Sequence, residues 1–216
     1  MKIGKTPFIL LKVMSKEQRF WDWFKVNESK YFFLNQIDSD YEREQLLDDL
    51  LSHIHEYCDQ LFFEVGGYPD EKQDLIITAE GDARFFNEVE ALVEHAPELE
   101  YWNVIAFKPI REDLTTEYKS IVLDPKLMYF IPLNNKSDPN KVGLRVYTEN
   151  YNASIQNDFL FATYLVLDNI LGERSSVLDI GYVEIESLSA VDSREDLIEL
   201  TQLLRYLKWK KSKLST

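Results

Sequence analysis

The apolar residues of this chain recur with two different periods, and segments of each kind alternate along the sequence. Amphipathic helices place apolar side chains about every 3.6 residues, whereas half-buried strands place them at every second residue. The pattern predicts helices near 15–34, 40–59, 82–96, 154–171 and 193–207, and strands at 61–65, 74–80, 101–108, 117–123, 126–133, 142–148 and 177–185. The strand at 101–108 is apolar on both faces, which is typical of a central strand. A chain patterned in this way is neither all-helical nor all-β.

We therefore expect a single compact α+β domain over residues 1–216, with a largely antiparallel sheet packed by helices. No linker rich in Gly, Ser or Pro and no sequence repeat divides the chain. A capping box at residues 15–18 begins the first helix, and a short break at residues 37–40 leads to the second. A short connection favours antiparallel packing, so the sequence predicts an N-terminal helical hairpin over about residues 15–59.

Negative charge is concentrated in one part of the chain. Residues 38–100 hold 19 acidic and 3 basic residues, a net charge of −16, whereas the whole chain carries −14. A field of this sign repels nucleic acid and anionic membranes and attracts basic partners. The plainer interpretation is that these charges only keep helix faces in solvent.

The helix near 40–59 carries part of this charge on the face opposite its leucines. The predicted binding residues on that face are Glu44, Asp48, Asp49 and Glu56. Trp21 is the remaining predicted binding residue, and it belongs to the aromatic run at residues 20–24. Packing in the core is the plainer interpretation of that run, and a protein-binding patch is the alternative.

Residues for metal binding or covalent catalysis are scarce. The chain has 3 His and 1 Cys, and His53 and His55 lie about 200° apart on a helix, too far to chelate one ion. There is no glycine-rich phosphate loop and no GxSxG motif. We expect no metal and no cofactor.

One carboxylate stands out within the predicted strand at residues 177–185. Asp179 shares a face with apolar residues there, and a buried carboxylate needs partners or a raised pKa. Arg145, on another predicted strand, is the candidate partner. A structural ion pair is the plainer interpretation, and an enzyme that uses Asp179 and Glu184, with or without a divalent cation, is the functional alternative.

The sequence contains neither a secretory signal pattern nor an apolar stretch near the about 20 residues of a membrane span. We therefore expect a soluble, cytoplasmic protein. The helix near 154–171 is apolar almost all round, so a homodimer through this helix is a further prediction.

Three segments together resemble a known family. They are FWDWF at residues 20–24 with Asn27 and Glu28 after it, IITAEGDARFF at residues 76–86, and HAPELEYWNVIAFKP at residues 95–109. Over residues 18–110 the chain is similar to a family of uncharacterised bacterial proteins. The resemblance implies a cytosolic bacterial protein with one α+β unit, and it carries over no function and no site residue.

Our leading hypothesis is a non-enzymatic interaction or regulatory module whose acidic segment binds a basic protein. Small acidic inhibitors work in this way, with charge accelerating encounter and aromatic residues adding affinity.

Overall fold

The computed structural model describes residues 14–67, 71–111, 114–134 and 138–214. Its α-helices are α1 (Lys16–Asn27), α2 (Asp40–Tyr57), α3 (Phe86–Glu94), α4 (Gln156–Leu171), α5 (Glu173–Asp179) and α6 (Leu203–Leu214). Its strands are β1 (Phe62–Gly66), β2 (Gln73–Thr78), β3 (Trp102–Ala106), β4 (Thr116–Tyr118), β5 (Ile121–Leu123), β6 (Tyr129–Asn134), β7 (Val142–Thr148), β8 (Ile180–Ser187) and β9 (Ile198–Glu199). The predicted α+β class is confirmed.

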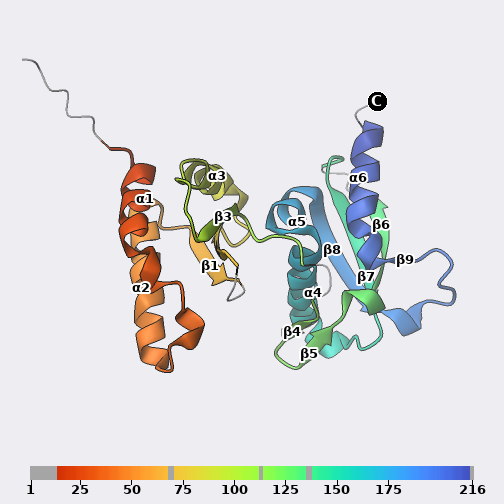
Figure 1. Ribbon diagram of the computed structural model, residues 1–216. Helices are drawn as coiled ribbons and strands as arrows, with labels where there is room; N and C mark the ends of the chain where they lie inside the picture. The colour runs from red at the N-terminus through yellow and green to blue at the C-terminus, as the bar shows by residue number, and fades with distance from the viewer. Residues whose placement is uncertain (1–13, 68–70, 112–113, 135–137, 215–216) are drawn as a thin grey trace, which may run out of the picture.

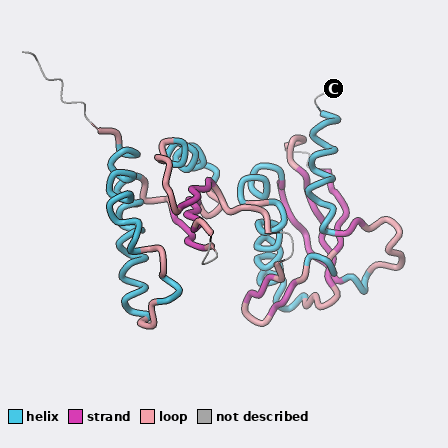
Figure 2. The backbone as a smooth tube through the Cα atoms, in the orientation of Figure 1, coloured by secondary structure: helices cyan, strands magenta, loops and turns pink. Residues whose placement is uncertain are grey.

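The elements form two groups, which Figure 1 shows connected by the segment that follows β3. We call α1 to β3 the N-terminal lobe and β4 to α6 the C-terminal lobe. Each lobe has its own hydrophobic cluster and its own main sheet, so the strands in Figure 2 gather in two places.

The N-terminal lobe is built on the three-stranded sheet β1–β2–β3. β1 and β2 are antiparallel, and β3 is parallel to β2 because α3 lies between them in the chain. Leu75 and Ile77 alternate along β2 and point to one face, where they join a cluster that includes Phe24 of α1, Leu50 of α2 and Val89 of α3. All three helices therefore cover the same face of this sheet.

The C-terminal lobe has a four-stranded sheet in the order β8–β7–β6–β9, and a small hairpin of β4 and β5. Its main sheet repeats the arrangement of the other lobe, since β6 and β7 are antiparallel and β8 is parallel to β7. The long helix α4 and the C-terminal helix α6 contribute to its cluster through side chains such as Val166 and Leu207. The apolar excess of α4 is thus largely buried within the chain, with Phe161 and Tyr164 still exposed.

The structure differs from the sequence-based expectation at several places. The predicted helix near 193–207 begins only at Leu203, because β9 and a 3₁₀ turn (200–202) occupy the residues before it. Three sheets replace one. α1 ends at Asn27, and two short 3₁₀ turns (28–30 and 34–36) occupy half of the connection to α2, so this connection is longer than the predicted short break. The predicted strand at 177–185 begins only at Ile180, because the chain remains helical through Asp179.

The two lobes meet at the start of α5. Gly172, with φ of 73°, ends α4 in a conformation that favours glycine and lets α5 begin at Glu173. The side chain of Glu173 is 1% exposed and accepts four hydrogen bonds from the N-terminal lobe and the segment after it. A single buried carboxylate therefore makes several of the polar contacts that hold the two lobes together.

Among the described residues, no helix combines the length and the apolar content that are needed to cross a bilayer.

Candidate functional site

Helix α2 presents the predicted acidic face. Ser39 caps its N-terminus, since the Ser39 hydroxyl accepts a hydrogen bond from the backbone N–H of Glu42. Leu50 and Ile54 anchor the opposite side of the helix in the core. Successive steps of four residues advance about 40° around a helix, so acids placed at such steps stay on one side. The exposed carboxylates on this side are Glu44, Asp48 and Glu56. Figure 1 shows α2 at the side of the molecule away from the C-terminal lobe.

These three carboxylates have no ion pair within the described part of the chain. Arg43, the one arginine of α2, is instead paired with Asp40. Lys16 and Arg19 of α1 line a groove together with Glu56, so the negative field near Glu56 is weaker than at the other two acids. Uncompensated charge on α2 is therefore greatest around Glu44 and Asp48.

The fourth predicted acid, Asp49, is half-buried and has a structural role. It accepts a hydrogen bond from the hydroxyl of Tyr31 at 3.0 Å, and burial together with the charge of Asp49 raises the pKa of that hydroxyl. The ring of His53, one turn further along α2, stacks on Trp23 at 3.6 Å between centroids. Asp49 thus helps to fix α2 to the aromatic segment before it.

Other acids of residues 38–100 lie away from α2, and three of them meet cations from outside that segment. Glu64 pairs with Arg111 and Lys108, Glu80 pairs with Lys108, and Glu90 pairs with Arg174. Burial alone would lower the pKa of Lys108, but the hydrogen bond and charge of Glu80 outweigh it and the pKa is raised. Part of the acidic segment therefore stabilises the junction between lobes. Asp70 lies outside the described residues.

The prediction that Trp21 contacts a partner is wrong. Its side chain is 2% exposed, and its indole N–H donates to the carbonyl of Leu92 at 2.7 Å. This carbonyl lies in the last turn of α3, where helix carbonyls lack intrahelical partners. Trp21 therefore packs in the core and caps α3, which is the plainer interpretation of the aromatic run.

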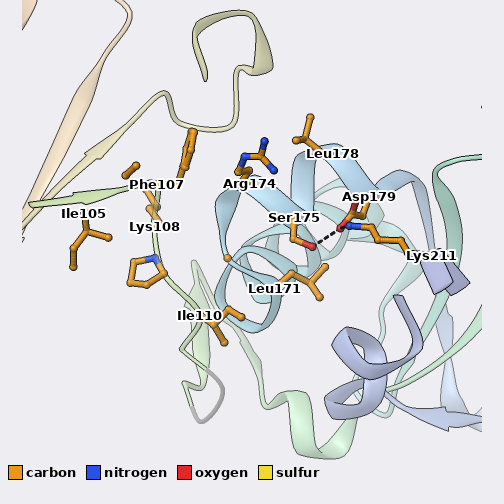
Figure 3. Close-up of a pocket in the computed structure, with 13 residues that line it drawn as sticks. Ile105, Phe107, Lys108, Ile110, Leu171, Arg174, Ser175, Leu178, Asp179 and Lys211 are labelled. Carbon is orange, nitrogen blue, oxygen red and sulfur yellow. Dashed lines mark hydrogen bonds and ion pairs between the residues drawn. The ribbon is translucent and has the colours of Figure 1, made fainter. Parts of the chain in front are cut away.

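Asp179 is buried, which the sequence left open, and its location and partners differ from the prediction. It ends α5, and its Oδ2 accepts hydrogen bonds from Ser175 at 2.5 Å and from Lys211 of α6 at 2.7 Å. Figure 3 shows this pair at the edge of a cavity of about 330 Å³, which is also lined by Phe107 and Arg174. Both donors engage the same oxygen, an arrangement that ties α6 to the end of α5.

Arg145 is not the partner of Asp179. Its guanidinium lies 2.8 Å from Glu184 and 3.3 Å from Glu186, two residues of β8 that share one face of the sheet. Because β7 and β8 are parallel neighbours with Arg145 opposite Glu184, the arginine meets these acids across the strands. The prediction placed Asp179 on a strand, whereas it lies in the last turn of α5, before β8 begins.

A groove beside α2 has no counterpart in the sequence-based predictions. It has a volume of about 810 Å³ and runs between α2 and β1. Its lining residues are Leu34, Arg43, Leu47, Asp48, Leu51, Phe62, Phe63, Glu64, Val65 and Arg111. Leu47 and Leu51 fell on the predicted apolar face of the helix, but nothing in the sequence separates a leucine that lines a groove from one that enters the core.

Across the described ranges, no group of three or more His, Cys, Asp or Glu side chains is placed to hold a metal ion. Comparison with protein-family models, curated proteins and solved structures finds no match for this chain.

Proposed function

We propose that this protein is a non-enzymatic interaction or regulatory module of the cytoplasm, and that the outer face of α2 binds a basic protein. The observation that carries the proposal is the exposed row of Glu44, Asp48 and Glu56, which lacks cationic partners in the described structure. Such a row attracts a cationic surface over distances of about 10 Å and accelerates association.

The core of the lobe suits this role because it holds α2 rigidly. Ile54 and Leu50 are fully buried, Tyr31 binds Asp49, and Trp23 stacks on His53. A face that is ordered before binding loses less conformational entropy when the partner docks.

Photo-crosslinking at Ser52, an exposed residue between Asp48 and Glu56, tests the proposal. We expect the crosslinker to capture a basic protein in cells. The same crosslinker at Ser120, on the exposed β4–β5 turn of the other lobe, should not capture that protein.

Charge neutralisation supplies the matched control. A variant that combines Glu44→Gln, Asp48→Asn and Glu56→Gln should lose the crosslinked product. A variant that neutralises the exposed loop acids Asp192, Glu195 and Asp196 changes the net charge equally and should keep it. Equal loss in both variants, or capture of an acidic protein at Ser52, would overturn the proposal.

A carboxylate-based enzyme is the second candidate, and the cavity beside Asp179 favours it. The two proposals differ in what Asp179→Asn does. Binding of a basic partner through α2 should be unaffected, whereas an enzyme that depends on this acid would lose turnover while it remains folded.

A further inference from the structure

We infer that the groove beside β1 binds an extended, basic segment of the partner, which adds a strand to the sheet β1–β2–β3. This inference rests on the proposed function, because it takes the segment that enters the groove from the basic partner that the acidic face of α2 binds. The inference also describes the partner more closely: the partner contains an extended segment in which apolar and cationic side chains alternate.

The first step is that β1 is an edge strand. Among the described strands it pairs only with β2, in antiparallel register from Phe62 opposite Thr78 to Gly66 opposite Asp74. Alternate N–H and C=O groups of an edge strand point away from its neighbour and can pair with another chain. An extended peptide uses such groups for affinity and neighbouring side-chain pockets for specificity.

The second step is that the groove follows this edge. Phe63 and Val65 lie on the core-facing side of β1, because both pack against the hydrophobic cluster of the lobe. Phe62 and Glu64 alternate with them and so point to the opposite face. Residues from both faces line the same groove, so the groove runs along the edge between them.

The third step concerns the apolar lining. Leu47 and Leu51 of α2 line the groove and are only partly buried, and Phe62 is 38% exposed. Burial of these surfaces by apolar side chains of a bound strand supplies the favourable free energy.

The fourth step concerns charge. The two arginines that reach the groove are already paired, Arg43 with Asp40 and Arg111 with Glu64. Asp48 lies on the rim, is exposed and has no ion pair in the ranges that the structure describes, and Glu44 lies one turn before it. The uncompensated charge at the rim is therefore negative, and it complements lysine or arginine.

The same charge disfavours a second copy of this chain as the occupant. Pairing β1 of one copy with β1 of another would bring two acidic α2 helices toward the same edge. Like charges in close apposition oppose association, so a basic segment fits the groove better than a second copy.

A synthetic peptide serves as the probe. It has about eight residues that alternate lysine and valine, enough to span a five-residue strand, and carries a fluorescent label. One twin has glutamate in place of lysine. A second twin is N-methylated at two consecutive central residues, which blocks both edges of the strand. Fluorescence anisotropy should show saturable binding of the first peptide and at least about tenfold weaker binding of each twin.

Two classes of protein variant separate this inference from the proposed function. Leu51→Asn and Phe62→Ala act on the groove and should weaken binding at least about tenfold. Leu127→Asn, at a leucine of the other lobe that is 64% exposed, is the control and should have no effect. Asp48→Asn should weaken binding mainly at low salt. Circular dichroism confirms that each variant is folded.

The outcomes are distinguishable. If Asp48→Asn weakens binding but Leu51→Asn, Phe62→Ala and N-methylation do not, the groove inference is overturned and the proposed function stands. If none of the substitutions matters, both are overturned. Absence of saturable binding at millimolar peptide, or a dimer by solution mass that Phe62→Ala dissociates, overturns the groove inference.

Discussion

The hydroxyl of Thr78 donates a hydrogen bond to Oε2 of Glu173 at 2.7 Å, and this bond joins the end of β2 to the beginning of α5. The backbone N–H groups of Ala79, Gly81 and Lys108 donate to the same carboxylate. The carboxylate therefore receives donors from both parallel strands of the N-terminal sheet at the point where each strand ends. Its removal would affect both lobes.

Glu173→Ala should lower the free energy of unfolding by at least about 3 kcal/mol, because it leaves several buried donors without an acceptor. Urea denaturation measures the change. Glu117→Ala, at an exposed glutamate of β4, should alter stability by no more than about 0.5 kcal/mol. A Glu173→Ala protein as stable as the control would show that this carboxylate does not fasten the lobes.

The two lobes should unfold in one transition, as the single-domain prediction requires. Glu173 couples them, so Glu173→Ala should split the transition into two. Hydrogen exchange with mass spectrometry, performed across a urea series, reports on peptides from β2 and from β7 separately. Different midpoints for these two strands in the unmodified protein would contradict the prediction.

Trp21→Phe should reduce stability by about 1–2 kcal/mol, since it leaves the carbonyl of Leu92 without its donor and opens a small cavity. Binding of the partner should be unchanged, because Trp21 is buried. Trp209→Phe is the matched control at a side chain that is 55% exposed, and it should cost little. Loss of partner binding by folded Trp21→Phe protein would restore the original prediction for this residue.

Asp168 is a half-buried residue of α4, and Asp168→Asn should stabilise the protein at neutral pH. Burial raises the pKa of Asp168 above its ordinary value of 3.8, and the hydrogen bond of Ser176 and the charge of Lys108 offset this only in part. The folded state thus holds the proton more tightly than the unfolded chain, so stability falls as pH rises from 3.8 through the raised pKa.

Urea unfolding of Asp168→Asn and the unmodified protein over a pH series measures this effect. The difference in unfolding free energy should be largest at neutral pH and should shrink below pH 3.8, where both states are protonated. Asp192→Asn, at an exposed loop residue, is the control. A destabilised Asp168→Asn protein at neutral pH would contradict the assigned direction.

Periodicity predicted the elements of this fold well where one face of the element is buried and the other is exposed. α2 and α3, which each have one buried and one exposed face, fall within the predicted segments. The start of β8 was missed because a segment as short as residues 177–181 fits both the 3.6-residue period of a helix and the two-residue period of a strand. The decisive feature was Gly172, which ends one helix and allows another to begin.

The candidate site was predictable only in part. The acidic row on α2 follows from helical spacing alone, whereas the groove depends on how β1 lies beside α2, which no local pattern specifies. Glu173 was missed because its four donors come from residues 65 to 95 positions away. Trp21 was misassigned because burial of an aromatic residue depends on what packs over it.

The most direct test of the central claim is the salt dependence of association between this protein and the partner captured at Ser52. For the unmodified protein, the association rate constant should fall at least about tenfold between low and high salt. The variant that neutralises Glu44, Asp48 and Glu56 should associate slowly at all salt concentrations. Equal salt dependence in both proteins would contradict a docking role for the acidic face of α2.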